Sequence, residues 1–241
     1  MKTYSKSLIL PLTFVLLAMG IPQELKQMNY LAYLKSDKSA WKKNVAFAMK
    51  LYQDQPSADT EFQLAFTEYG LLNVSMVDMD KKLFESYVEE CENRLEKLAA
   101  GKKYGADAKA LLSGLYGYKI AHSPLKAMLL GSKSSGLLEL AMKQNPESSI
   151  VLKMYASNQY FTPEMWGGDK ELALKAFEKS TQKLLGTDLE KSWIHLDNLA
   201  WTGILQKEMG DQVKAKATWE KALEIEPEFY WVSKSLLPSL N

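Results

Sequence analysis

The stretch that decides the fold is residues 199–227, "LAWTGILQKEMGDQVKAKATWEKALEIEP". On both sides of Gly210-Asp211, small and apolar residues recur at the three- and four-residue spacings of amphipathic helices. Gly203 leaves room on the first helix for a neighbour, and the second helix carries a small, large, small face, made of Ala215, Trp219 and Ala222. Pro227 ends that second helix. The stretch therefore predicts a pair of helices joined by a tight turn.

The small, large, small spacing of that second helix returns twice upstream. Its members there are Ala173, Phe177 and Ser180, and before them Ser134, Leu138 and Ala141. Two insertions lengthen the turns inside these upstream pairs, "HSPLKAMLLG" at 122–131 and "FTPEMWGGD" at 161–169. The sequence therefore predicts degenerate repeats of one helix pair, with extra residues at two inner turns.

This pattern resembles the tetratricopeptide repeat, most closely over 196–229, although Leu199 replaces the usual aromatic residue and Gln206 the usual tyrosine. The resemblance implies an all-α fold, a right-handed α-solenoid of stacked helix-turn-helix repeats. We expect these repeats to span 58–241. Because stacked pairs leave an open face at each end, we expect 21–57 to form N-terminal capping helices.

Helical periodicity runs through the rest of the chain, and no segment alternates like a β-strand between turn residues. Glycine or proline separates many of the segments. The predicted helices are 24–35, 38–53, 58–74, 81–99, 106–121, 134–144, 149–161, 169–184, 189–209, 212–225 and 229–237.

The first twenty residues have the pattern of a secretory signal peptide. Lys2 and Lys6 precede an apolar run from Leu8 to Met19, and Ala18 and Gly20 are the small residues expected before a cleavage site. We expect residues 1–20 to be removed before Ile21, which gives a periplasmic or secreted protein. The alternative is an uncleaved anchor, but the run is shorter than the roughly 20 residues that span a bilayer.

The composition excludes several classes of protein. The 241 residues include 30 basic and 29 acidic side chains, a formal charge of +1, and Arg94 is the only arginine. A near-neutral, arginine-poor chain carries no electrostatic signature of nucleic-acid binding. The single cysteine, Cys91, lies on the apolar stripe of a predicted helix, so we expect it in the core rather than in a redox site.

The catalytic and metal-binding motifs that we considered are incomplete. "GSKSSG" at 131–136 lacks the lysine and hydroxyl residue of a phosphate-binding loop and is predicted to be a turn before a helix. His122 is expected at a helix end and His195 in helix packing or on the surface. Lysines follow Asp78-Met79-Asp80 where a calcium loop would place oxygen ligands. We therefore expect no catalytic residue, no metal and no cofactor.

If the first helix of each pair lines a concave groove, as the resemblance implies, that groove combines aromatic rings with lysines. Its predicted lining is Tyr118, Lys119, Lys153, Tyr160, Asp197, Trp201 and Lys207. Such a lining suits an extended peptide or an anionic ligand. The alternative is that several of these rings pack against the adjacent helix.

The second candidate site is the inserted loop with Met165, Trp166, Gly167 and Gly168. These apolar residues either fill the seam between neighbouring repeats or form part of a binding surface, since insertions in repeat proteins often lie on one functional face.

Two functions follow from the signal peptide and the repeats. The first is a non-catalytic scaffold or adaptor that binds a protein or peptide in the cell envelope or outside the cell. The second is an accessory of an envelope transport system, similar to the T-component of tripartite periplasmic transporters, which is also built from helical repeats. That second function predicts a symmetric oligomer with a central hole. Neither requires nucleic acid or a membrane span after cleavage.

Overall fold

The computed structural model describes residues 13–240 of the chain, and the side chains from residue 23 onward. Every regular element in this part of the chain is helical, which confirms the predicted all-α class. The α-helices are α1 (Thr13–Leu34), α2 (Lys38–Asp54), α3 (Ala58–Ser75), α4 (Lys81–Ala99), α5 (Gly105–His122), α6 (Ala127–Gln144), α7 (Ser149–Phe161), α8 (Lys170–Leu184), α9 (Trp193–Glu208) and α10 (Gln212–Ile225). Short helical turns are η1 (Pro124–Lys126), η2 (Glu164–Trp166), η3 (Val232–Leu236) and η4 (Leu237–Leu240).

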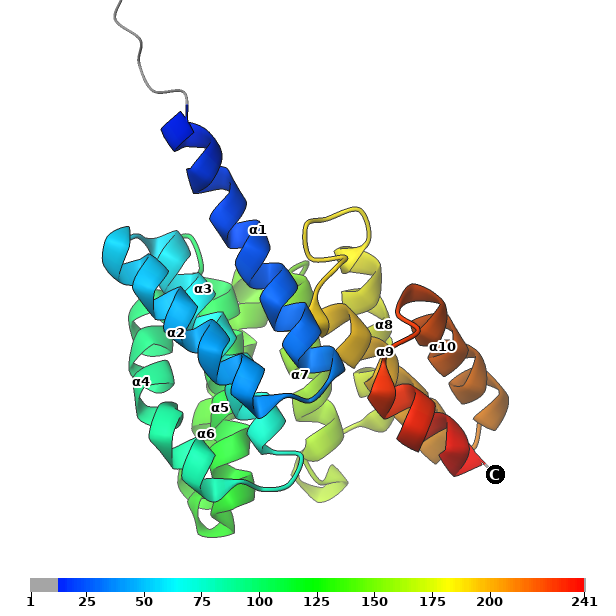
Figure 1. Cartoon of the computed structure of the whole chain (residues 1–241). Coiled ribbons are helices and arrows are strands. Elements are labelled where there is room, and N and C mark those ends of the chain that lie inside the picture. Colours follow the sequence, from blue (N-terminus) through cyan, green and yellow to red (C-terminus); the bar gives the residue numbers. More distant parts are fainter. Residues whose placement is uncertain (1–12, 241) are drawn as a thin grey trace, which may run out of the picture.

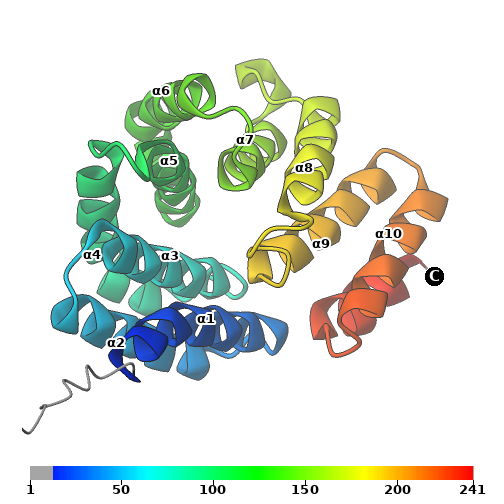
Figure 2. The same ribbon diagram turned by 90° about the horizontal axis from the view of Figure 1, so that it is seen from above.

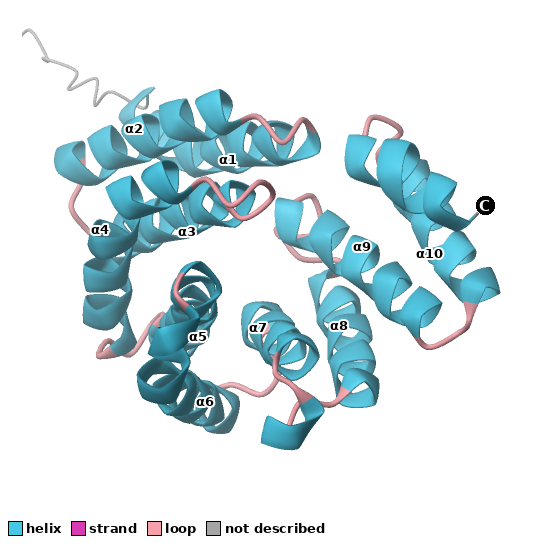
Figure 3. Cartoon of the chain, turned by 90° about the horizontal axis from the view of Figure 1, so that it is seen from below, coloured by secondary structure: helices cyan, strands magenta, loops and turns pink. Residues whose placement is uncertain are grey.

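The helices pack as neighbouring pairs, α3 with α4, α5 with α6, α7 with α8 and α9 with α10. The turns inside these four pairs lie toward the lower end of the molecule in Figure 1, and the turns between pairs lie toward the upper end. Figure 3 views the molecule from the lower end. Most helices begin at a side chain that accepts a hydrogen bond from a backbone N–H in the first turn. These N-caps are Asp37, Ser57, Asp80, Ser148, Asp169 and Asp211.

The glycine and tryptophan of the decisive stretch pack as the sequence predicts. A Cβ atom on Gly203 would lie 2.2 Å from Nε1 of Trp219, so only glycine lets the indole lie this close to α9. The indole N–H of Trp219 donates a 3.1 Å hydrogen bond to the Ala200 carbonyl oxygen, and its side chain is fully buried. Ala215 and Ala222 on either side of Trp219 are fully buried as well.

The predicted turn at 131–136 is wrong, because α6 begins at Ala127 and passes through "GSKSSG". Tertiary packing explains the helix. Leu130 and Ser134 of this segment are buried, and the Ser134 and Ser113 hydroxyls lie 2.8 Å apart in a hydrogen bond between α6 and α5. The two glycines are tolerated because they face open space. The predicted helix 189–209 also differs, since its first residues form a turn and α9 begins at Trp193.

The N-terminal helix α1 packs against α9 as well as against its sequence neighbours α2 and α3. Seen from above in Figure 2, the helices follow a curved path from α2 to α10, and the end of α1 points toward α9. The ring of Tyr33 lies 5.7 Å from both the Trp193 and the Phe229 rings. Lys26 forms an ion pair with Asp188, just before α9. Residues near the two ends of the chain therefore share one core.

Two predictions concern single residues or the N-terminal segment. Cys91 is fully buried in the core, as predicted, and burial raises the pKa of its thiol well above the usual value. The predicted signal peptide, 1–20, lies mostly outside the described residues; α1 begins within it at Thr13, and cleavage before Ile21 stays a prediction. None of the helices in the described part of the chain combines the length and hydropathy needed to cross a membrane.

Candidate binding surface

Two residues of the predicted groove form a buried ion pair. The Lys153 ammonium of α7 donates to Oδ2 of Asp197 on α9, and each side chain is only 3% exposed. The Tyr33 hydroxyl of α1 donates to Oδ1 of the same carboxylate at 2.7 Å. Burial and the neighbouring Asp197 carboxylate raise the pKa of Tyr33 well above its usual value. The groove prediction is therefore wrong for Lys153 and Asp197, because α1 packs against α9 and closes the space over them.

Tyr118 is half-buried and packs against the core. Its ring stacks on Tyr69 with 5.4 Å between centroids, and its hydroxyl accepts a 2.8 Å hydrogen bond from Nδ2 of Asn73. Burial raises the pKa of Tyr118 to about 12. For Tyr118, the second sequence-based alternative therefore holds: the ring packs against an adjacent helix.

The other two groove lysines are held by bonds within the chain. Lys119 forms an ion pair with Glu92 of α4 and lies over the Tyr116 ring, 5.7 Å from its centroid. Lys207 donates hydrogen bonds to the backbone oxygen and the hydroxyl of Ser239, at 2.7 and 2.9 Å. The structure therefore does not place the three predicted lysines in one cationic lining.

The predicted residues Tyr160 and Trp201 do come together, in a cluster that we call the aromatic rim. Its members are Tyr160, Phe161, Trp201 and Trp231. Trp201 is its centre, with ring centroids 5.3 Å from Tyr160, 5.2 Å from Phe161 and 5.8 Å from Trp231. Phe161 is the most exposed member, while Tyr160, Trp201 and Trp231 are half-buried. The rim is therefore a partly open apolar surface built from α7, α9 and the segment before η3.

Polar contacts fix the orientation of Tyr160. Its hydroxyl donates a 2.7 Å hydrogen bond to Oε1 of Glu208, and Lys170 donates to Oε2 of the same carboxylate at 2.8 Å. Burial and this carboxylate raise the pKa of Tyr160 well above its usual value. On one side of the rim, Lys170 and Glu208 form a paired polar edge next to Tyr160. On the other side, the apolar ring of Phe161 is exposed to solvent.

The inserted loop projects its apolar side chains into solvent. Met165 is 83% and Trp166 67% exposed, so they do not fill the seam between neighbouring pairs. Gly167 has a φ of +93°, the left-handed region that favours glycine. A Cβ on Gly168 would lie 1.7 Å from the Thr162 carbonyl oxygen. Both glycines are therefore required by the shape of the loop.

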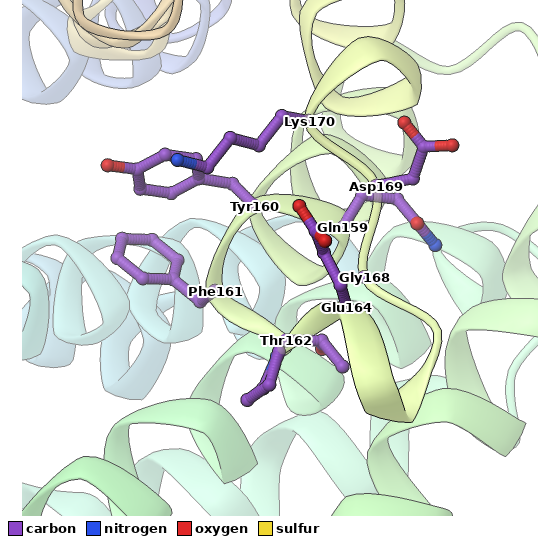
Figure 4. Close-up of a pocket in the computed structure, with 9 residues that line it drawn as sticks. Gln159, Tyr160, Phe161, Thr162, Glu164, Gly168, Asp169 and Lys170 are labelled. Atoms are coloured by element: carbon purple, nitrogen blue, oxygen red, sulfur yellow. The ribbon is translucent and has the colours of Figure 1, made fainter. Parts of the chain in front are cut away.

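Backbone hydrogen bonds hold this loop against the end of α7. The Gly168 N–H donates to the Pro163 carbonyl oxygen at 3.2 Å, and the Asp169 N–H donates to that of Gln159 at 3.0 Å. A small cavity of about 170 Å³ lies between the loop and the rim, lined by Gln159, Tyr160, Phe161, Thr162, Pro163, Glu164, Gly168, Asp169 and Lys170 (Figure 4). The side-chain oxygen of Gln159 is buried and accepts no hydrogen bond within the described part of the chain. The rim and the loop thus meet at one cavity that residues of both line.

Sequence reasoning missed two members of this surface. Phe161 directly follows Tyr160, and its exposure depends on α7 ending there. Trp231 lies in the predicted helix 229–237, outside the predicted groove lining, and only the fold of the C-terminal segment brings it to Trp201.

The two histidines lie outside this surface. His122 ends α5, as predicted, and packs against Phe84 in a tilted arrangement with 4.3 Å between ring centroids. Burial lowers the pKa of His122. His195 is buried in helix packing, and its Nδ1 lies 2.8 Å from the Glu190 carbonyl oxygen. Among the described residues, no three histidine, cysteine or carboxylate side chains are grouped as metal ligands would be.

The fold and this surface define the class of the molecule as an all-helical protein of packed helix pairs with a partly exposed aromatic edge. No family model matches the chain, and no curated protein is significantly similar to it. Among solved structures it is similar to the crystal structure of BtubC (BKLC) from P. vanneervenii, with 19% sequence identity and a TM-score of 0.44 over 80% of this chain and 74% of that chain. A likeness this weak carries no argument about function.

Proposed function

We propose that the protein is a non-catalytic scaffold that binds a segment of another protein at the aromatic rim and the inserted loop. The observation that carries this proposal is the exposure of Phe161, which lies beside the half-buried Trp201, and of Met165 and Trp166 in the loop that follows Phe161. Aromatic and methionine side chains are enriched at protein interfaces, where they give large apolar contact areas. Such a surface fits an extended peptide that presents apolar side chains.

The scaffold is, in this proposal, a right-handed solenoid of tetratricopeptide-like repeats over 58–241 that acts in the cell envelope or outside the cell. The packing of Gly203 against Trp219 supports the repeat, since both residues stand where the repeat pattern requires them. The basic and apolar pattern of residues 1–20 supports export.

The absence of catalysis in this proposal rests on the environments of the reactive side chains. The Cys91 thiol is buried with a raised pKa, which opposes formation of the reactive thiolate. Neither histidine hydrogen-bonds to the side chain of a serine, a cysteine or a carboxylate in the described part of the chain.

The test is a peptide library screened against the purified protein. We expect the selected peptides to be rich in apolar residues. The double variant Phe161→Ser and Trp166→Ser should weaken binding by tenfold or more, on the order of 1.4 kcal/mol, as loss of interface aromatic residues does. The matched control is Tyr230→Ser, which removes an exposed ring outside the rim and the loop. Equal binding by the double variant and the control would contradict the proposal.

The transport-accessory function differs in its oligomeric state. It requires a symmetric oligomer with a central hole, whereas the buried Lys153–Asp197 pair occupies the interior of the single chain. A hole would therefore have to lie between copies, and a monodisperse monomer in light scattering would contradict that function.

A further inference from the structure

The corner between α5 and α6 carries the most exposed apolar side chains among the described residues. Leu125 of η1 is 94% and Met128 of α6 is 95% exposed, and the adjacent Leu129 is exposed as well. A side chain with almost its full surface in water has no neighbour on any side, so these residues stand on a convex tip rather than in a groove. Moving each of these side chains out of water would lower the free energy.

This corner belongs to one end of the molecule. The other turns inside the helix pairs also expose large apolar side chains, namely Val77, Met79, Met165, Trp166, Met209 and Val213. All of these turns lie toward the lower end in Figure 1. Several separate apolar side chains that protrude from one end of a molecule can all contact a flat surface at once, whereas a single cavity on another protein would take up only one of them.

The segment that forms the corner carries basic charge only, and the nearest acidic side chain that acts on it, Glu85 of α4, lies near His122 at the end of α5 together with Lys81. Between Asp107 and Glu139 the chain contains lysines but no acidic residue. Lys126 lies between Leu125 and Met128 in the sequence, and Lys133 follows Leu129 by four residues. Both lysines are exposed and form no ion pair within the described part of the chain. Glu139, the next acidic residue, is already paired with Lys143 at 2.6 Å. Apolar side chains flanked by unpaired lysines complement a bilayer surface that carries anionic headgroups.

We propose that the α5–α6 corner is a docking site for the surface of an anionic lipid bilayer. Leu125, Met128 and Leu129 enter the interface between headgroups and acyl chains, and Lys126 and Lys133 contact the headgroup phosphates. The corner then holds the protein at the membrane without a spanning segment. This inference does not rest on the aromatic rim, whose members come from α7, α9 and the segment before η3.

The test is cosedimentation of the purified protein with vesicles of phosphatidylcholine, alone or mixed with phosphatidylglycerol. The full chain and the chain from Ile21 are both assayed, because the apolar residues 8–19 would bind vesicles by themselves. The readout is therefore the difference between each variant and its parent. We expect binding to the mixed vesicles to exceed binding to phosphatidylcholine alone and to fall as salt is raised.

Two double variants separate the apolar contribution to vesicle binding from the electrostatic contribution. Leu125→Ser with Met128→Ser should lower partitioning by about tenfold or more on mixed vesicles. Lys126→Glu with Lys133→Glu should lower it by about tenfold on mixed vesicles and leave phosphatidylcholine vesicles unaffected. The matched controls, Leu185→Ser and Lys102→Glu, change exposed residues at turns between pairs, on the opposite end of the molecule.

Three results would overturn the proposal. The first is no binding of the chain from Ile21 to mixed vesicles. The second is an equal loss of binding in the corner variants and in the controls, which would show unspecific adsorption. The third is a serine variant that binds vesicles normally but loses a peptide ligand, because the corner would then contact protein. Unchanged thermal unfolding of each variant excludes misfolding as the cause.

Discussion

The interior of the molecule and its lower end differ in how their lysines are paired and in which side chains are exposed. In the interior, Lys153 and Asp197 neutralise each other and the Tyr33 hydroxyl completes the carboxylate's bonds. At the lower end, Leu125 and Met128 stand in solvent beside lysines that have no ion-pair partner in the described part of the chain. Charged residues are thus buried and paired where a ligand was expected, and apolar residues are exposed where only turns were expected.

This contrast indicates where each region acts. A buried ion pair offers no free group to a ligand, and removal of one partner leaves the other charge buried without compensation, so Lys153 and Asp197 belong to the interior of the fold and not to a binding surface. Exposed apolar side chains add little to the folded state, so their presence on one end is explained by what that end contacts. Stability and binding therefore occupy separate parts of the chain.

The largest effect is expected from breaking the interior ion pair. Lys153→Ala leaves the Asp197 carboxylate buried with the Tyr33 hydroxyl as its remaining partner, and we expect the free energy of unfolding to fall by about 3–5 kcal/mol. Urea unfolding followed by circular dichroism measures this loss. The double variant Lys153→Met and Asp197→Leu removes both charges and should lose much less.

The control for this prediction is an ion pair on the surface. Lys170→Ala removes the exposed partner of Glu208 and should leave the urea midpoint almost unchanged. Similar losses for Lys153→Ala and Lys170→Ala would mean that the interior is open to water, and the distinction between the two regions would fail.

A smaller effect is expected from two glycines in different settings. Gly203→Ala forces a methyl group into the Trp219 indole and should destabilise the protein by about 1–3 kcal/mol, despite the better helix propensity of alanine. Gly136→Ala on the exposed side of α6 meets nothing within 4 Å and should stabilise it by about 0.5–1 kcal/mol. Thermal unfolding measures whether each variant is less or more stable than the parent protein. A change in the same direction for both variants would contradict the packing described for α9 and α10.

Much of the fold could be predicted from the sequence because helix periodicity is a local signal. The bounds of α2, α3, α4, α7 and α10 follow from spacing and N-cap residues within each segment. The segment 131–136 could not be predicted in this way. Its glycines and serines are typical of a turn, and the helix there depends on contacts of Leu130 and Ser134 with other helices.

The candidate site was less accessible to sequence reasoning. The groove prediction assigned Lys153 and Asp197 to a free surface because spacing shows which face of a helix points inward, but not what covers it. The cover is Tyr33 of α1, which is 164 positions from Asp197 in the sequence. The repeat register assigned Tyr160 and Trp201 to the same groove lining but did not predict that their rings pack together. Trp231 joins them from the C-terminal segment.

The smallest effect on stability is expected at the inserted loop. Met165→Ser with Trp166→Ser removes two exposed side chains and should change the free energy of unfolding by less than about 0.5 kcal/mol. Thermal unfolding measures this, and peptide binding is measured on the same samples. The informative result is the combination of unchanged stability with lost binding, because a side chain that does nothing for the fold is then needed for the partner. A large loss of stability would instead place Met165 and Trp166 in the seam between α7 and its neighbours, where the sequence alternative had them.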